Sequence, residues 1–457
     1  MDTVTKDPNP CRVIGVLDDG AASLSPAALA HVRSADVVIG GARTLALLEA
    51  ELKSASVRHD LTGRLKQVPD WVRAARADHL HCVVLATGDP LCHGIAPYLA
   101  QHLCVQALDI LPNLSTLQLA CARIGLAWHD ARIVSVHAKD AGEWRRGAAP
   151  GHGLYGLAQA LRAEARLLVL TSPDNSPDRI ARLLLAEGLG EEFLMAVAEN
   201  LLQPEERVLA ELTPQEAAGM RFAALNVVLL WRVAPVARPV RFGLADSAFA
   251  QRQPEKGLIT KQEVRAVSLA RLQLRDDSVV WDIGAGSGSV GLEAARLCPR
   301  GHVFAIEKNE ADHAIAAHNH AAFGVSNYTL IHGKAPDGLD AWPDPDAVFI
   351  GGSGGELAAL IAQVLDRLRP GGNLVMNFVT LENLATATAA LQALKASPEN
   401  ENGSACVSWG QTPGTRAQQE VTWDVLQLQA ARSKPILHMH RMAAENPVWI
   451  VCARRVA

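Results

Sequence analysis

Long apolar runs are missing from this sequence of 457 residues. A helix that spans a membrane needs roughly 20 consecutive apolar residues, and no stretch of that kind occurs. The segment from Met1 to Pro10 is polar and lacks the apolar centre of a secretion signal. We therefore expect a soluble, cytoplasmic protein with no membrane partner.

Patterned cysteines are missing as well. The eight cysteines form no Cys-x-x-Cys pair and have no regular spacing, which argues against a zinc ribbon or a disulfide framework. Three histidine pairs remain as metal candidates: His79 with His81, His318 with His320, and His438 with His440. The middle pair would point to different faces of a helix, and the other two lack cysteine or carboxylate neighbours at ligand spacing. The sequence predicts no metal site.

An excess of positive charge is also lacking. The chain has 43 Lys and Arg against 48 Asp and Glu, a formal net charge of -5. General binding to nucleic acid needs a basic field, so we expect no nucleic-acid partner. Only 4% of the residues are aromatic while 49% are hydrophobic, so aliphatic side chains must build the core. The length predicts two or three domains.

The first half of the chain alternates apolar runs with turns and helices. Ser25-Pro26 is typical of a helix start, and a second helix is expected over 178–187. The expected strands are 12–17, 36–39, 82–86, 131–136, 167–171 and 226–232. Strands followed by loops and helices predict a mostly parallel α/β sheet.

A Pro- and Arg-bearing stretch over 233–249 has no periodicity and reads as a linker. We place the domain boundary there, giving domains 1–236 and 237–457. The strand and helix alternation then restarts at residue 279 and ends on a strand over 446–453. The segment 396–419 is rich in Ser, Asn, Gly, Gln and Thr and is interpreted as a mobile surface insertion.

A glycine-rich loop follows the apolar run at 279–283. Gly284, Gly286 and Gly288 alternate, and Asp282 precedes them, placed to accept hydrogen bonds from the loop amides. Glycine is needed where the backbone turns tightly and approaches a ligand. Glu307 ends the next strand, where an acid can bind both ribose hydroxyls. The alternating spacing favours S-adenosylmethionine over a dinucleotide, whose fingerprint is Gly-x-Gly-x-x-Gly.

The second half resembles a known family. The run Asp282 to Ala295 is similar to the first motif of the Rossmann-like methyltransferases, and 259–265, 347–355, 377–382 and 446–448 are similar to the carboxy-terminal domain of the precorrin-6Y C-5,15-methyltransferases (decarboxylating) of cobalamin biosynthesis. The family has an acid where Lys334 stands. Beyond Asp282, the three glycines and Glu307, the resemblance implies cofactor contacts from Thr260, Lys308, Ala335 and Gly351. The substrate contacts expected here are Lys261, Arg265, Gly352, Ser353 and Asn377, of which the cations would clamp substrate carboxylates.

The first half resembles the tetrapyrrole methylase family through 39–43, 86–94, 115–122 and 224–228. The resemblance implies two α/β subdomains, ahead of a Rossmann-like seven-stranded fold in the second half. Its cofactor contacts would be Gly88, Asp89, Pro90, Ser115, Thr116 and Asn226, and its substrate contacts Arg43 and His93. One loop departs from the family: where a Gly-x-Gly-Pro-Gly pattern is usual, Gly15 is followed by Val16-Leu17-Asp18-Asp19-Gly20.

The combined resemblance implies an S-adenosylmethionine-dependent methyltransferase that methylates precorrin-6Y at C-5 and C-15 and decarboxylates the ring C acetate, giving precorrin-8. It also implies a homo-oligomer, and it names no catalytic side chain. Methyl transfer from a sulfonium needs alignment more than a strong base. Two alternatives stay open. One is an RNA methyltransferase; the other is a single active carboxy-terminal domain joined to a substrate-binding, non-catalytic amino-terminal domain.

Overall fold

The computed structural model describes residues 9–137, 140, 142–233, 240–252, 259–395 and 421–456. The chain forms two compact units, Met1–Trp144 with Gly156–Val236, and Arg145–Tyr155 with Ala237–Ala457. The whole of the predicted insertion 396–419 and part of the predicted linker are outside the described residues. No helix in the described ranges is long and apolar enough to cross a membrane.

The first unit begins with a five-stranded parallel sheet of order β3-β2-β4-β1-β5. Its strands are β1 (Cys11–Val16), β2 (Val37–Gly40), β3 (Val57–Asp60), β4 (Cys82–Thr87) and β5 (Leu108–Leu111). The helices between them are α1 (Pro26–Ser34), α2 (Ala42–Leu47), α3 (Val68–Ala77) and α4 (Ala96–His102), with 3-10 turns η1 (Gly20–Ser23), η2 (Glu49–Glu51), η3 (Leu65–Gln67) and η4 (Val105–Ala107). The side chain of Ser25 accepts a hydrogen bond from the Ala28 amide, which confirms the predicted helix start.

A second sheet of the first unit has the order β6-β7-β10-β8-β9, and only its β6–β7 pair is parallel. The strands are β6 (Arg132–Ser135), β7 (Arg166–Leu170), β8 (Phe193–Glu199), β9 (Arg207–Leu212) and β10 (Asn226–Arg232), and the helices are α5 (Thr116–Ile124), α6 (Tyr155–Ala163), α7 (Pro177–Ala186) and α8 (Pro214–Ala218). The prediction of a mostly parallel first half is therefore wrong for this sheet. The connection between β8 and β9 is too short for a parallel crossover, so the pair is antiparallel.

The second unit contains a seven-stranded sheet of order β13-β12-β11-β14-β15-β19-β16, which confirms the predicted strand number. Its strands are β11 (Val279–Ile283), β12 (His302–Glu307), β13 (Tyr328–His332), β14 (Ala347–Ile350), β15 (Asn373–Phe378), β16 (Val421–Leu428) and β19 (Val448–Arg455). The helices are α9 (Gln262–Leu272), α10 (Ser289–Leu297), α11 (Glu310–Phe323), α12 (Leu357–Arg367) and α13 (Leu381–Lys395), with 3-10 turns η5 (Asp246–Ala248) and η6 (Leu339–Ala341). Strand β19 runs antiparallel to both of its neighbours, β15 and β16.

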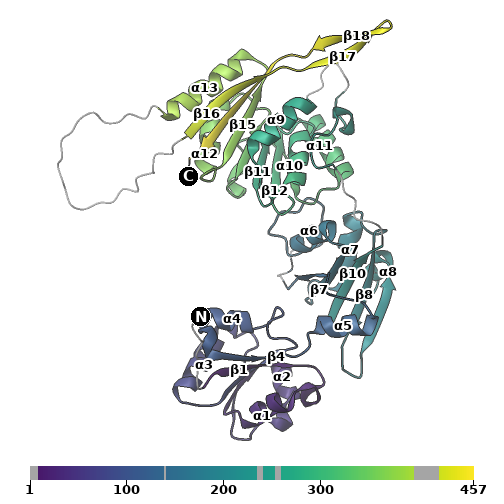
Figure 1. The fold of residues 1–457 in the computed structure, drawn as a ribbon, viewed down its shortest axis with the longest axis vertical. Coiled ribbons are helices and arrows are strands. Elements are labelled where there is room, and N and C mark those ends of the chain that lie inside the picture. Colours follow the sequence, from purple (N-terminus) through teal and green to yellow (C-terminus); the bar gives the residue numbers. More distant parts are fainter. Residues whose placement is uncertain are drawn as a thin grey trace, which may run out of the picture. The chain divides into compact units, whose positions relative to one another are not determined.

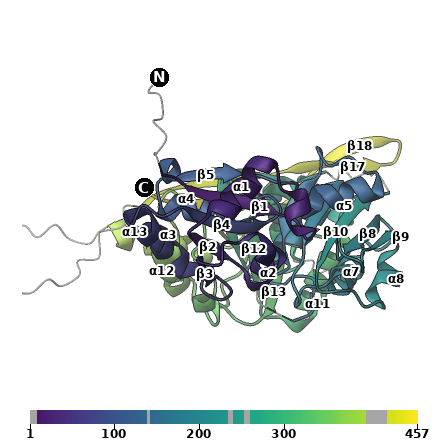
Figure 2. The ribbon, with the colours of Figure 1, turned by 90° about the horizontal axis from the view of Figure 1, so that it is seen from below.

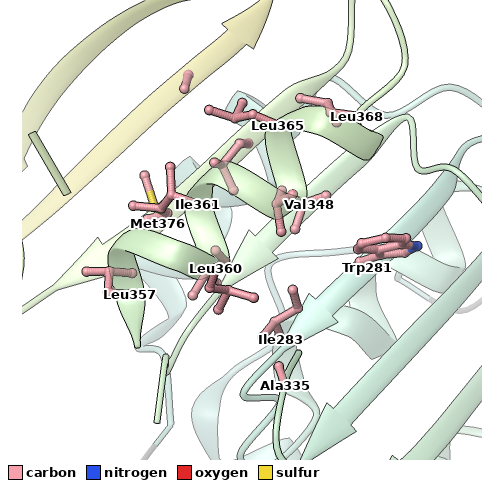
Figure 3. Close-up of a cluster of buried hydrophobic side chains, with 14 of the residues drawn as sticks. Trp281, Ile283, Ala335, Val348, Leu357, Leu360, Ile361, Leu365, Leu368 and Met376 are labelled. Carbon is pink, nitrogen blue, oxygen red and sulfur yellow. The ribbon is translucent and has the colours of Figure 1, made fainter. Parts of the chain in front are cut away.

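Helix α12 illustrates how the sheet is covered. Its apolar residues Leu357, Leu360, Ile361 and Leu365 are buried and belong to one cluster with Val348 of β14 and Met376 of β15 (Figure 3). The strand order reverses at β11, whose neighbours are β12 and β14. Such a reversal opens a crevice at the carboxyl ends of the strands, where doubly wound sheets bind their ligands.

The second unit also contains a hairpin that was not predicted. Strands β17 (Ala431–Ile436) and β18 (Met439–Ala444) form a separate two-stranded sheet, the β17–β18 hairpin. The hairpin extends beyond the seven-stranded sheet in both views (Figure 1; Figure 2). Nearly all of its side chains are exposed, so the alternating burial that marks a strand in a sequence is absent here.

Candidate functional site

A cavity of about 930 Å³ lies at the carboxyl ends of the parallel strands of the second unit. The structure brings eleven of the predicted residues to its wall: Thr260, Lys261, Gly284, Gly286, Glu307, Lys308, Ala335, Gly351, Gly352, Ser353 and Asn377. Arg252, Asn309, Asp312 and Glu445 also line it and were not predicted. Asn309 caps helix α11 by accepting hydrogen bonds from Ala311 and Asp312, a helix-start signal that was visible in the sequence.

The three glycines of the loop after β11 all have left-handed backbone conformations. Their φ angles are 70° at Gly284, 55° at Gly286 and 76° at Gly288. A Cβ atom on Gly284 would lie 2.6 Å from both the nitrogen and the oxygen of Gly352. The glycine-rich loops after β11 and β14 therefore approach each other so closely that no side chain fits between them.

Glu307 holds the glycine loop from the end of β12. Its Oε2 accepts a hydrogen bond from the Gly286 amide at 2.8 Å, and its Oε1 accepts one from the Asn309 amide at 2.8 Å. The residue is buried, yet it lines the cavity. A carboxylate that accepts two backbone hydrogen bonds is fixed in place, and it faces the cavity where a ribose would present its hydroxyls.

Asp282 has a different position from the one predicted. Its carboxylate is buried and accepts a hydrogen bond from the Gly291 amide of α10 at 3.0 Å, while the loop amide of Gly286 goes to Glu307. Asp282 is not in the cavity wall, and neither is Gly288, which caps α10 and where a Cβ would lie 3.1 Å from the Tyr328 hydroxyl. The predicted cofactor contacts of these two residues are corrected to a supporting role beneath the loop.

Burial raises the pKa of Asp282 to about 7. The nearby charge of Glu307 also raises this pKa, whereas the hydrogen bond from the Gly291 amide lowers it. Its Oδ1 atom has no hydrogen-bond partner within the described part of the chain. The ordinary pKa of the residue is 3.8, so between pH 3.8 and about 7 the folded chain keeps a proton that the unfolded chain releases. The contribution of Asp282 to the free energy of unfolding therefore falls as the pH rises through this window.

Asp282→Asn removes this titration. We expect the free energy of unfolding of the native chain to fall relative to the variant between pH 4 and pH 7, by up to about 4 kcal/mol. Denaturant unfolding of both proteins at several pH values measures the difference. Asp276→Asn, a change at an exposed carboxylate before β11, is the control and should keep the native profile. A constant difference between native chain and Asp282→Asn across this range would contradict the prediction.

Arg265 was predicted to bind substrate, and its position contradicts direct contact. Its side chain is 0% exposed. The guanidinium donates to Glu293 at 2.9 Å, to Asp246 at 3.2 Å and to the carbonyl oxygens of Thr260 and Leu244. An amphipathic helix with charged residues looks the same in sequence whether an arginine faces solvent or a buried glutamate. Lys261, by contrast, lines the cavity and is 46% exposed.

Two substitutions separate these roles. Arg265→Met leaves Glu293 buried without its cationic partner, so we expect the free energy of unfolding to fall by about 3 to 5 kcal/mol. Lys261→Met is expected to change stability by less than about 0.5 kcal/mol, because its ion pair with Asp246 is long and exposed. Urea unfolding of both variants checks the contrast. Equal stability losses would contradict the structural role of Arg265.

Predicted residues of the first unit converge where β4 ends. Gly88 has a φ of 65° and donates its amide hydrogen bond to the carbonyl of Val16 at 2.9 Å. A Cβ on Gly88 would lie 3.4 Å from Cα of Ser115 and 3.5 Å from the nitrogen of Thr116. Ser115 caps helix α5 through a capping box with Gln118. The loop after β4 and the start of helix α5 therefore lie next to each other.

Among the remaining predicted residues of the first unit, some side chains are bonded within the chain and one is exposed. Asp89, before Pro90, accepts a hydrogen bond from the Leu91 amide at 2.9 Å, and His93 is exposed with a φ of 54°. The side chain of Asn226 is bonded to Thr171 and to the Ala223 carbonyl. Arg43 forms an ion pair with Asp18 at 2.7 Å. Contact of these residues with a ligand stays a prediction.

Both halves match known families. Residues 11–216 match the tetrapyrrole (corrin/porphyrin) methylases, and residues 253–428 match the precorrin methyltransferase domain. A Sinorhizobium protein named precorrin-6Y C(5,15)-methyltransferase [decarboxylating] is 34% identical over 81% of this chain and 84% of its own length. A Salmonella typhimurium protein named cobalt-precorrin-6B C(15)-methyltransferase (decarboxylating) is 36% identical over 43% of this chain and 89% of its own length.

A solved structure, precorrin-6Y C5,15-methyltransferase from Geobacter metallireducens, is 38% identical and covers 47% of this chain and 96% of its own chain, with a TM-score of 0.39. The Sinorhizobium relative spans both halves of the chain, and each half matches its own methyltransferase family. The chain therefore belongs to the family of precorrin-6Y C(5,15)-methyltransferases (decarboxylating).

Proposed function

We propose that the chain methylates precorrin-6Y at C-5 and C-15 with S-adenosylmethionine and decarboxylates the ring C acetate, giving precorrin-8. The observation that carries this proposal is the cavity of the second unit, in which the glycine loop and Glu307 meet. Membership of the family supports the substrate and the reaction. A cytoplasmic location is part of the same proposal.

The residues of the cavity fit S-adenosylmethionine. Gly284 and Gly286 would let the cofactor lie against the loop backbone, and Glu307 would accept hydrogen bonds from its ribose. The volume of about 930 Å³ is at the upper end of the range for small-molecule sites, which leaves room for part of a second ligand. The cofactor supplies a methyl group on a sulfonium, a leaving group that needs no activation by the protein.

Substrate binding at the second unit is assigned to the side of the cavity built by Lys261, Ser353 and Asn377. Lys261 has its charge partly exposed at the wall and can bind a carboxylate of the precorrin. Asn377 is oriented by a hydrogen bond from its Nδ2 to the Ser268 hydroxyl at 2.9 Å. The Salmonella relative, named for C-15 alone, matches a stretch of about the length of this unit, so we assign C-15 and the decarboxylation to the second unit and C-5 to the first.

Calorimetric titration of S-adenosylmethionine into the full chain tests the proposal. We expect two sites, one for each unit. An assay with precorrin-6Y should then transfer two methyl groups and release one CO2 per substrate. One site would mean that the first unit does not methylate, and the absence of both sites would refute the proposed function.

We also propose that the chain is a homo-oligomer and that the β17–β18 hairpin contacts the other copy. A two-stranded sheet standing alone is marginally stable in water. Leu437 is 91% exposed at its tip and Met442 is 65% exposed on β18, and no described segment of the chain covers them. A second copy of the hairpin offers the same apolar side chains and free strand edges.

Light scattering tests this assembly. Leu437→Ser combined with Met442→Ser is expected to lower the molar mass at a given concentration. Val105→Ser changes another exposed apolar residue, 66% exposed in the first unit, and should leave the mass unchanged. A monomeric native chain, or an unchanged mass for the double variant, would contradict the proposal.

A further inference from the structure

The β17–β18 hairpin is positively charged in a chain whose formal net charge is -5. Residues 431–444 contain three Arg and Lys residues and no Asp or Glu. Strand pairing sets Lys434 of β17 directly opposite Arg441 of β18. Both side chains are exposed, and neither has an ion-pair or hydrogen-bond partner in the described part of the chain. Like charges at opposite positions are destabilising, so this pair weakens the small sheet that carries it.

Arg432, Lys434 and Arg441 form one face of the hairpin, the cationic face. Arg432 and Lys434 are two residues apart on β17, and side chains two residues apart in a strand point to the same side. Arg441 shares this side because it is directly opposite Lys434. Met442, which the proposed assembly uses, is the next residue on β18 and therefore points to the other side. The cationic face is thus separate from the surface that carries Met442.

The base of the cationic face is fixed at the wall of the cavity in the second unit. Nε of Arg432 donates a hydrogen bond to Oε1 of Glu445 at 3.0 Å, and Glu445 lines the cavity. Nη2 of Arg432 donates to Oε2 of Glu263 at 2.5 Å. Glu263 lies in the first turn of α9, two residues after Lys261, which lines the same cavity. Arg432 therefore neutralises two carboxylates beside the cavity and joins the hairpin to the side of the wall that carries Lys261.

The cavity has too little room for a whole tetrapyrrole beside the cofactor. Its volume of about 930 Å³ is that of a site for one small molecule and part of a second. The rest of the tetrapyrrole must then lie outside the cavity, against a surface next to the wall. Lys434 is two residues from Arg432, a rise of about 7 Å along the strand, so its ammonium group lies just beyond the wall.

We propose that Lys434 and Arg441 on the cationic face bind carboxylates of the tetrapyrrole whose reacting part enters the cavity of the second unit. The inference rests on the proposed function, because it takes the precorrin as the source of those carboxylates. A carboxylate next to both cations offsets their mutual repulsion, so the charge pair that weakens the hairpin by itself strengthens the complex. The face selects polycarboxylate substrates over neutral molecules of similar size.

Charge reversal at Lys434 separates binding from folding. Lys434→Glu replaces the repulsion with an ion pair to Arg441, so we expect the variant to be at least as stable as the native chain in denaturant unfolding. The same change removes a carboxylate contact and adds a repulsion. We therefore expect the full chain to bind uroporphyrin, a stable fluorescent tetrapyrrole polycarboxylate, about threefold to tenfold more weakly. Fluorescence titration measures this affinity.

Arg454→Glu is the matched control, since it makes the same change of net charge in the same unit. Arg454 is exposed and lies opposite Asn373, the first residue of β15, so it is at the end of the sheet away from the cavity. We expect its affinity for uroporphyrin to stay within about twofold of the native value, because salt screens a distant exposed charge. Lys434→Gln removes the charge without reversing it and should weaken binding only about twofold. The first unit is identical in all these variants, so any difference in affinity belongs to the second unit.

Unchanged affinity of Lys434→Glu, or an equal loss in Arg454→Glu, overturns the proposal, and so does a native chain that does not bind uroporphyrin. A changed molar mass of Lys434→Glu in light scattering also overturns it, because the cationic face would then be an interface between copies. Calorimetry with S-adenosylmethionine on the same samples tests the cofactor site separately. Normal binding of S-adenosylmethionine with unchanged affinity for uroporphyrin would refute this inference alone, whereas loss of S-adenosylmethionine binding in the native chain would refute the proposed function.

Discussion

Glu307→Ala is expected to abolish measurable binding of S-adenosylmethionine to the second unit. The substitution removes the acceptor of two backbone hydrogen bonds, from Gly286 and from Asn309, each 2.8 Å long. A buried amide left without an acceptor costs about 1 to 3 kcal/mol, and the contact with the ribose is lost as well. The affinity should therefore fall by about 100-fold or more.

Calorimetry on the full chain distinguishes loss of the site in the second unit from loss of both sites. The native chain should show two sites and Glu307→Ala one, because the first unit is unchanged. Glu310→Ala, in the first turn of α11 and exposed, is the matched control and should retain both sites. If Glu307→Ala kept both sites with native affinity, Glu307 would be a structural residue of the loop and the cofactor would have to bind elsewhere.

Gly284→Ala is expected to lower the stability of the second unit and to remove its cofactor site. The new methyl group would lie 2.6 Å from Gly352, whose backbone cannot move without disturbing the loop after β14. A left-handed φ of 70° adds the usual cost of about 1 to 2 kcal/mol for a residue with a Cβ. Because the close contact between the two backbones adds to this cost, we expect Gly284→Ala to lower the free energy of unfolding by about 3 kcal/mol or more.

A matched control separates the cost of the left-handed backbone from the cost of the close contact with Gly352. Gly338 also has a left-handed φ, 81°, but nothing lies within 4 Å of the position of its Cβ. Gly338→Ala should therefore lose only about 1 kcal/mol in denaturant unfolding and should bind S-adenosylmethionine like the native chain. Equal losses in the two variants would show that the contact between the two glycine-rich loops contributes nothing.

The sequence by itself determined the local organisation of the second site. Strands β11 and β12 lie where the sequence predicts them, because each is specified by a short apolar run followed by its own turn. Local pattern also identified Gly284, Gly286 and Gly288, because a left-handed turn needs glycine. It identified Glu307 as well, because this residue ends the apolar run that forms β12.

Only the tertiary structure decided which groups meet. Arg265 and Glu293 are 28 residues apart, and Asp18 and Gln203 are 185 residues apart, so no periodicity reveals these pairs. The antiparallel pairing of β8 and β9 and the exposed β17–β18 hairpin follow from strand pairing, and in the hairpin no buried face marks the strands. The loop amide of Gly286 binds Glu307 instead of Asp282 because the direction of each side chain depends on how neighbouring strands are in register, and a single chain segment does not contain that information.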